Sequence, residues 1–231
     1  KKKVPYQELI DYVNARGGLT FWAHPEAEYS GQFGSETGSP LTDSVLKFVG
    51  SGGIRIKTEP YFPLLNDTYG YTGFAVFYEG YRVVGKPEGL WDMLLMQYCT
   101  GRREHPVWAI SELELESGTD PVTASDNQTI LLVREKSEKA YLDALKKGRM
   151  YAFTRGMARS MMIRDYSVIS GATRAISGEV IDYGPDARLV FAMDVAGNPL
   201  DLEIAVVVDG RLADRRKSQG TTAFELPLKL P

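Results

Sequence analysis

The stretch GGLTFWAHP, residues 17–25, decides how this chain begins to fold. Gly17 and Gly18 can take the left-handed conformation that ends a helix. An amphipathic helix before them is predicted from apolar residues at helical spacing: Tyr6, Leu9, Ile10 and Val13. Residues 19–23 then predict a strand buried on both faces, and His24 stands where that strand ends.

The same pattern of short apolar runs continues outward from this stretch as far as residue 156. It predicts three more strands, at residues 73–78, 107–110 and 129–133. Helices are expected between them, at residues 41–49, at residues 90–98, and from a cap at Ser137 to a stop at Gly148. Apolar strands separated by helices are typical of a mainly parallel sheet or barrel. The longest expected loop runs from Pro25 to Pro40 and could form a mobile lid.

Beyond residue 156 the apolar residues recur with period two. They are Leu189, Phe191, Met193 and Val195, then Leu202, Ile204, Val206 and Val208, then Phe224, Leu226, Leu228 and Leu230. Asp209 and Gly210 form a hairpin-turn signal between two of these runs. We therefore expect an α/β domain over residues 1–156 and a small antiparallel β-sandwich over residues 157–231.

Composition and charge limit the kinds of molecule that this chain is expected to bind. Of 231 residues, 43% are hydrophobic and 25% charged, which is ordinary for a soluble globular protein. The formal charge of −3 gives no reason to expect a nucleic-acid or anionic membrane partner. No apolar run is long enough for a membrane helix, and no signal peptide is visible, so a cytoplasmic protein is expected rather than an exported one. The single cysteine, Cys99, is expected to be a buried, inert thiol.

The two histidines differ in context. His24 follows a predicted strand, and in α/β folds functional side chains collect at such strand ends. It can be read as a structural residue or as a metal ligand. His105 follows the polar stretch 101–104 and precedes a strand, which predicts a solvated loop position.

Three glutamates alternate with leucines just beyond the strand at 107–110: Glu112, Glu114 and Glu116. In an extended chain all three carboxylates point to one side. There they could bind a hard cation or activate a water, or they could form the solvated face of a strand extension. Glu26 and Glu79 also lie at or near strand ends and are weaker candidates.

Four ordered segments resemble the PHP (polymerase and histidinol phosphatase) family. GGLTFWAHP at 17–25 resembles its "GG, apolar residues, AHP" segment, and LWDMLL at 90–95 resembles its "WD-x-LL" helix. VWAIS at 107–111 resembles the strand before its last metal motif, Asp-x-His. ALKKGRMY at 144–151 resembles its closing "AL-x-x-G-R-x-Y" segment, so that the likeness covers about residues 4–156.

The resemblance implies a fold and an activity. The fold would be a distorted seven-stranded β/α barrel, of which this chain holds the C-terminal part, followed by a β-sandwich. The activity would be hydrolysis of a small phosphorylated substrate by water activated on divalent metal ions at the C-terminal ends of the strands. Zn, Mn, Fe or Mg are the expected ions.

The metal ligands implied by the resemblance are His24, Glu114 and Glu116. Aligning the last strand places Glu114 at the Asp and Glu116 at the His of the Asp-x-His motif. A shift of two residues would use Glu112 and Glu114 instead, and both registers stay open. In either register a carboxylate replaces an imidazole, which favours harder ions such as Mg²⁺ or Mn²⁺ over zinc.

The chain departs from the family in one further respect. The family's upstream His-x-His motif has no counterpart among two histidines as far apart as His24 and His105. We therefore expect an N-terminal barrel segment to be missing from this chain, and the chain alone to be inactive. The alternative is a catalytically inactive binding or structural module on a PHP-like scaffold.

Overall fold

The computed structural model describes residues 6–27, 30–33, 54–57, 60–77, 79–113, 126–154, 161–196 and 201–229. Three of the features expected above lie outside the described residues. They are the helix at 41–49, the division near residue 156, and the glutamates Glu114 and Glu116.

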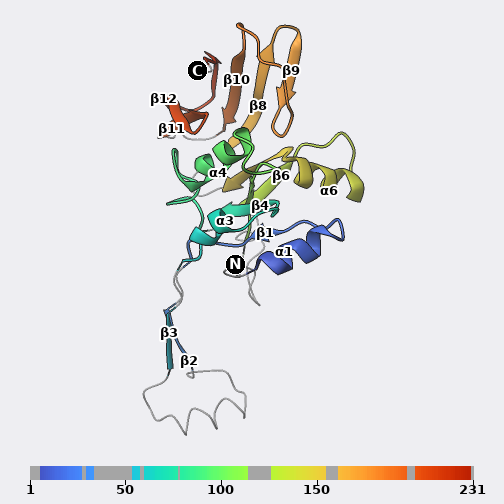
Figure 1. Cartoon of the computed structure of the whole chain (residues 1–231). Coiled ribbons are helices and arrows are strands. Elements are labelled where there is room, and N and C mark those ends of the chain that lie inside the picture. The colour runs from blue at the N-terminus through green and yellow to red at the C-terminus, as the bar shows by residue number, and fades with distance from the viewer. Residues whose placement is uncertain are drawn as a thin grey trace.

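A three-stranded parallel sheet forms the centre of the N-terminal part (Figure 1). Its strands are β1 (Phe21–Trp22), β4 (Gly73–Phe77) and β5 (Trp108–Ser111), in the order β1-β4-β5. The central strand β4 is buried along its first four residues, as its unbroken apolar sequence predicts. The strand expected at 19–23 is shorter, and β1 is only half-buried because it lies at the edge of this sheet.

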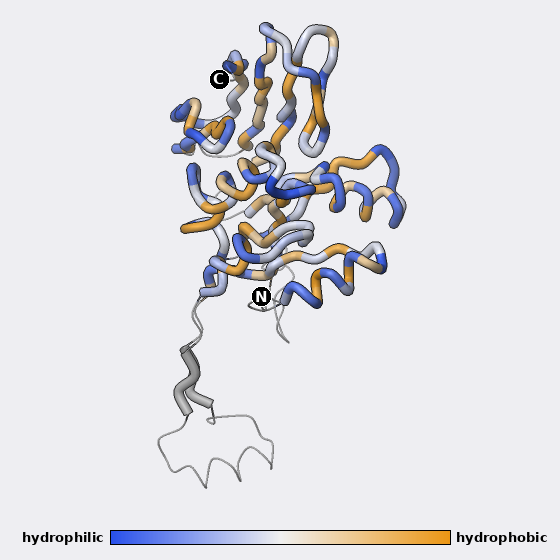
Figure 2. The backbone as a smooth tube through the Cα atoms, in the orientation of Figure 1, coloured by the Kyte–Doolittle hydropathy of each residue, from blue (hydrophilic) through white to orange (hydrophobic). Residues whose placement is uncertain are grey.

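In the described part of the chain, four helices lie around this sheet: α1 (Gln7–Asn14), α3 (Pro63–Asp67), α4 (Leu90–Cys99) and α6 (Glu138–Lys147). Phe74 of β4 meets Trp91 of α4 edge to face, with ring centroids 5.7 Å apart. Figure 2 shows hydrophobic residues alternating with hydrophilic ones along α1, as an amphipathic helix requires. The buried core consists of Ile10, Leu65, Tyr71, Phe74, Val76, Val84, Leu94 and Val107. None of the helices in the described part of the chain is long and apolar enough to cross a membrane.

An antiparallel pair of strands, β6 (Asn127–Leu131) and β7 (Met150–Thr154), lies beside β5. Ser111 joins them, because its N–H donates to Thr129 Oγ1 at 2.9 Å and its hydroxyl donates to the carbonyl of Phe153 at 2.9 Å. The expectation of a mainly parallel arrangement is therefore wrong for the strand predicted at 129–133. After α6 the chain turns back and runs antiparallel to β6. Within the described ranges the strands form no closed barrel.

The predicted ends of α6 are confirmed. Ser137 Oγ accepts a hydrogen bond from the N–H of Ala140 at 3.2 Å, which is an N-cap. Gly148 ends the helix in the left-handed conformation, with φ of 71°. A Cβ atom at Gly148 would lie 2.3 Å from the ring of Trp108, so a larger residue does not fit there.

Two short strands, β2 (Ser30–Phe33) and β3 (Ile54–Lys57), pair antiparallel. The expected loop from Pro25 to Pro40 is wrong at residues 30–33, which form β2. Its partner β3 lies more than twenty residues further along the chain. The sequence pattern of a hairpin with a short turn therefore does not predict this pair.

The C-terminal part is built from antiparallel strands, consistent with the expected β-sandwich. Four strands form one sheet in the order β13-β10-β8-β9, and two more pair as β11-β12. Their bounds are β8 (Met161–Ser170), β9 (Thr173–Ile176), β10 (Arg188–Val195), β11 (Asp201–Val208), β12 (Arg211–Gln219) and β13 (Thr222–Pro227). The Arg216 guanidinium of β12 lies 4.1 Å from the ring centroid of Phe224 on β13, so the two layers meet there. The predicted turn is confirmed, since Asp209 and Gly210 both have positive φ, 51° and 72°.

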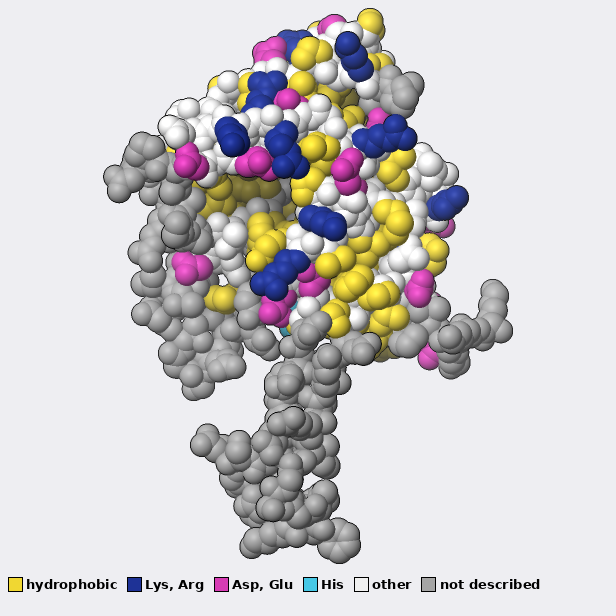
Figure 3. Space-filling model, turned by 90° about the vertical axis from the view of Figure 1, so that its left-hand side faces the viewer, with side chains coloured by type: hydrophobic (Ala, Val, Ile, Leu, Met, Phe, Trp, Pro, Cys, Tyr) yellow, Lys and Arg dark blue, Asp and Glu magenta, His cyan; other side chains and the backbone are white. Residues whose placement is uncertain are grey.

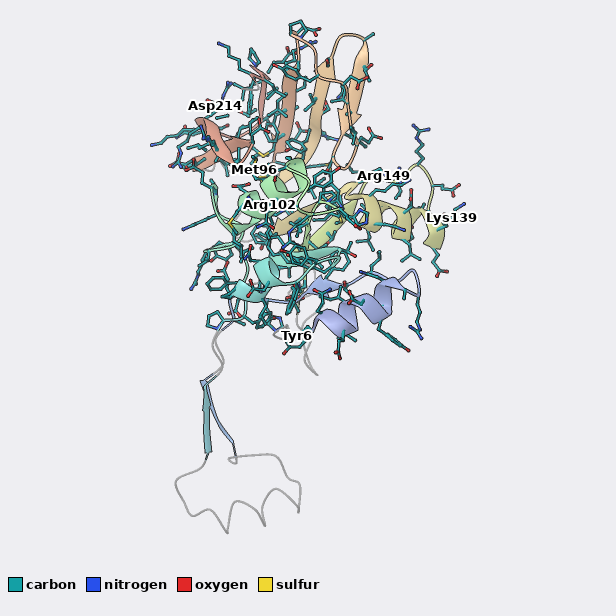
Figure 4. The ribbon with its side chains drawn as sticks, viewed as in Figure 1. Tyr6, Met96, Arg102, Lys139, Arg149 and Asp214 are labelled. Carbon is teal, nitrogen blue, oxygen red and sulfur yellow. The ribbon has the colours of Figure 1, made fainter. Side chains whose placement is uncertain are left out.

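Specific contacts join the C-terminal strands to the N-terminal part. The Ser177 hydroxyl is 2.8 Å from the carbonyl oxygen of Gly148, and the N–H of Leu212 donates to Glu88 Oε1 at 3.2 Å. Met96 of α4 lies below β11 and β12 in Figure 4, and a Cβ at Gly210 would be 2.8 Å from its Cγ. Figure 3 shows positive and negative side chains interspersed over this side of the molecule.

Candidate functional site

The candidate site lies where the three parallel strands end. His24 follows β1, Glu79 follows β4 and Glu112 follows β5 directly. Because parallel strands end at one edge of a sheet, three residues far apart in sequence reach the same place. Two of them, His24 and Glu79, have positive φ of 24° and 53°, a conformation that non-glycine residues rarely adopt. Such backbone strain is often found at functional sites.

His24 and Glu112 form a close pair across 88 positions of sequence. His24 Nδ1 lies 3.1 Å from Glu112 Oε1, and the backbone N–H of His24 donates to the same oxygen at 2.5 Å. The side chains are 32% and 24% exposed. An ionised carboxylate only accepts hydrogen bonds, so in this contact a neutral imidazole carries its proton on Nδ1 and its lone pair on Nε2.

This arrangement suits a metal-binding histidine. Metal-ligating histidines usually donate their second ring N–H to a carboxylate or carbonyl, which fixes the ring and makes it more basic. With Nδ1 held by Glu112, Nε2 is the atom through which His24 could bind an ion. Among the described residues, however, no group of three or more His, Cys, Asp or Glu side chains is placed to hold a metal. In the described part of the chain, the groups that suit a metal site are therefore one imidazole, His24, and the carboxylate of Glu112 beside it.

Tyr61 lies against the same strand end. Its hydroxyl donates to the carbonyl oxygen of Ala23, next to His24. Burial raises the pKa of Tyr61 to about 12, and the negative charges of Glu112 and Glu79 contribute to the increase. The phenol therefore stays neutral at the pH values at which most enzymes work.

The pKa of Tyr61 gives a prediction for alkaline pH. The folded chain holds this proton above the ordinary value of 10.0, so stability from Tyr61 is present below pH 10 and is lost as the pH rises towards 12. In a titration followed by the ultraviolet absorbance of ionised phenols, Tyr61→Phe should remove signal near pH 12. A loss of signal near pH 10 would contradict the assigned environment of Tyr61.

Glu26 holds a loop. Its Oε1 accepts hydrogen bonds from the N–H groups of Val83 and Val84, both at 2.8 Å, and its Oε2 accepts one from Arg82 at 3.0 Å. Its own N–H donates to the carbonyl of Glu79 at 2.9 Å. Three amide donors stabilise the carboxylate charge and fix the backbone that follows β4. Glu26, one of the weaker ligand candidates, is placed here as a structural clamp.

A cleft of about 400 Å³ adjoins this loop. It is lined by Glu26, Phe77, Glu79, Tyr81, Arg82, Asn127 and Thr154. Asn127 connects it to the histidine pair, because its Nδ2 donates to the carbonyl oxygen of Glu112 at 3.1 Å. Two cavities are larger: one of about 800 Å³ at the amino ends of the parallel strands, and one of about 540 Å³ along α1 and β1, which Ala23 and Tyr61 also line. We favour the smaller cleft because two residues that line it, Phe77 and Asn127, hydrogen-bond to the backbone of Glu112.

The other residues singled out from the sequence lie away from this edge. His105 is exposed in a turn before β5, as expected. The prediction for Cys99 is wrong, because its side chain is exposed. Cys99 is the last residue of α4 and lies five positions from the buried Leu94, a separation that places the two on different faces of the helix.

Fold and site together define a mixed α/β protein with a carboxylate-oriented histidine at the carboxyl edge of a parallel sheet, followed by antiparallel sheets. Comparison with protein families, characterised proteins and solved structures finds no match to this chain.

Proposed function

We propose that this chain is the C-terminal part of a PHP-like, metal-dependent phosphoesterase. The observation that carries the proposal is the His24–Glu112 pair, in which one carboxylate oxygen lies within hydrogen-bond distance of both Nδ1 and the backbone nitrogen of the histidine. A site of this form at the carboxyl ends of parallel strands is suited to holding a catalytic ion. In this proposal β1, β4 and β5 belong to a seven-stranded β/α barrel.

Each residue of the site has a separate task. His24 ligates through Nε2, and Glu112 orients its ring. Glu114 and Glu116 stay proposed ligands, beyond the described end of this segment at residue 113. A bound Zn, Mn, Fe or Mg ion would supply an activated water and neutralise phosphate oxygens. Glu26 holds the loop that carries Glu79.

An upstream barrel segment is the proposed partner of this chain. A groove of about 540 Å³ runs along α1 and β1. Tyr6 and Leu9 line it and are 57% and 58% exposed. Trp22 Nε1 and Thr20 Oγ1, which are buried beside it, have no hydrogen-bond partner in the described structure. A further strand and helix packed here would cover the apolar side chains and extend the sheet at β1.

Metal analysis tests the proposal. The longest natural form of the protein, purified without chelators, should carry about two equivalents of Zn, Mn or Fe per chain, as two-metal phosphoesterases do. It should then hydrolyse a small phosphomonoester such as p-nitrophenyl phosphate, and a chelator should abolish the activity. Traces of metal only, even after reconstitution, would contradict it.

A second candidate is an inactive binding module on the same scaffold. It is favoured by the fact that the described residues contain no group of three or more His, Cys, Asp or Glu side chains placed to hold a metal. This candidate predicts no change in the melting temperature with Mn²⁺ or Zn²⁺. If the chain binds the metal ion, as the phosphoesterase proposal requires, an ion present at 100 times its Kd should stabilise the folded state by about 2.7 kcal/mol. Thermal melts with and without each ion therefore separate the two candidates.

A further inference from the structure

The side chains that line the cleft beside Glu112 indicate which kind of ligand it can bind. It lies between the carboxyl end of β4, the start of β6 and the end of β7, which contribute Phe77, Asn127 and Thr154. Its volume of about 400 Å³ falls in the range of sites for small molecules. A nucleic-acid strand or a folded protein is far larger than such a cleft, so the ligand is expected to be small.

One side chain gives this cleft a cationic group. Of the described residues that line it, Arg82 is the one with a positive charge. Its backbone is fixed by the hydrogen bond from its N–H to Glu26 Oε2, while its side chain is exposed. Two carboxylates, Glu26 and Glu79, also line the cleft. That of Glu26 is occupied by three backbone amides, so it competes less for the guanidinium than Glu79 does. A guanidinium of this kind can bind two oxygens of a phosphate at once.

Two aromatic rings give the cleft an apolar wall. The ring centroids of Phe77 and Tyr81 are 6.1 Å apart, with the planes inclined at 45°. Tyr81 is 49% exposed, so part of its side chain is accessible to a ligand. Arg82 and Tyr81 are adjacent, and the guanidinium lies 5.9 Å from the ring centroid. A ligand bound by both would carry an anionic group next to a flat apolar group.

We propose that this cleft binds a small phosphomonoester with a flat, apolar leaving group. Arg82 binds the phosphate oxygens, and the rings of Phe77 and Tyr81 contact the leaving group. That the anion is a phosphate rests on the proposed function. The cleft adds the class of substrate, a phosphomonoester whose leaving group is flat and apolar. The hydrogen bond from Asn127 to the carbonyl of Glu112 links the wall of the cleft to the residue that contacts His24.

Two non-hydrolysable probes test the proposal without any catalysis. Phenylphosphonate and methylphosphonate share the anion and differ in the flat apolar group. Titration calorimetry of the full chain in the presence of a chelator, so that no metal can hold the anion, should show phenylphosphonate binding about tenfold more tightly. Equal affinities, or no binding of either probe, would overturn the proposal.

Matched variants assign the two contributions. Arg82→Gln should weaken both phosphonates about tenfold or more, because a charge-assisted contact is lost. Tyr81→Leu should weaken phenylphosphonate alone, about fivefold, and Tyr81→Phe should retain its affinity. Arg102→Gln, at an exposed arginine in the turn after α4, is the control and should change neither affinity. Unchanged binding in Arg82→Gln would refute the role of Arg82.

The two proposals can fail separately. Metal-dependent hydrolysis by a protein that binds the two phosphonates equally would leave the phosphoesterase proposal standing and remove the substrate class. Selective binding of phenylphosphonate by a protein without metal or hydrolysis would establish the cleft and count against the phosphoesterase.

Discussion

Replacing Arg103 by methionine should lower the free energy of unfolding by about 3 kcal/mol. Arg103 is 5% exposed. Its guanidinium donates to the carbonyl oxygens of Leu65 at 2.9 Å, Asn66 at 3.2 Å and Thr68 at 3.0 Å, around the end of α3. The last carbonyls of a helix have no partner within it, so this side chain satisfies them. Methionine keeps most of the length and apolar contact but removes the donor to the carbonyl oxygens of Asn66 and Thr68, while the Leu65 oxygen keeps its hydrogen bond from the Tyr71 hydroxyl at 2.7 Å.

The neighbouring arginine provides the control for this prediction. Arg102 is exposed, so Arg102→Met should change stability by less than about 0.5 kcal/mol. Urea unfolding followed by tryptophan fluorescence measures both variants, with equal m values required for the comparison. A loss below about 1 kcal/mol for Arg103→Met would mean that water replaces the guanidinium at the carbonyls.

Local chemistry made several elements predictable. The unbroken apolar sequence at 73–78 predicts the buried strand β4, because a central parallel strand has both faces covered. The ends of α6 followed from Ser137 and Gly148, whose side-chain oxygen and left-handed backbone satisfy the helix termini. The turn at Asp209-Gly210 followed from the ease with which these residues adopt positive φ.

Elements that depend on distant partners were not predictable in this way. Strand β8 alternates in burial, but Asp165 and Ser167 occupy covered positions and hide the apolar period. Arg103 stands in a polar stretch, and its carbonyl partners are 35 to 38 residues away. The order β6-α6-β7 suggests a parallel crossover, yet the strands pair antiparallel. In each case the deciding contact is tertiary.

The candidate site was predictable in part. The position of His24 at a strand end marked it from the sequence, and the structure brings Glu112 to it. The alternation of Glu112, Glu114 and Glu116 could not show which carboxylate meets the histidine, because that depends on the register of β5 against β4. No motif or spacing in the sequence marks Arg82 or Tyr81 as a residue of the site. They reach the cleft through hydrogen bonds from the loop to Glu26.

Variants of the histidine pair should lose metal in a graded order. His24→Ala removes the proposed ligand and should reduce bound metal to background, with loss of hydrolysis. Glu112→Ala should weaken metal binding about 10- to 100-fold, the usual effect of removing a carboxylate that orients a ligating histidine. Glu112→Gln should lose less than about tenfold, because the amide oxygen can still accept from Nδ1 and from the backbone N–H of His24.

The glutamine variant separates two roles of Glu112. If Glu112 orients the imidazole, an acceptor oxygen suffices and the order is wild type, Gln, Ala. If Glu112 is itself a ligand, as a shift of the metal motif by two residues would require, the negative charge is needed and both variants should lose metal as His24→Ala does. Metal titration of the three variants in the longest natural form of the protein, with circular dichroism to confirm folding, distinguishes these cases. Full metal binding and activity in His24→Ala would refute both roles, because each makes the imidazole the ligand that the carboxylate serves or joins.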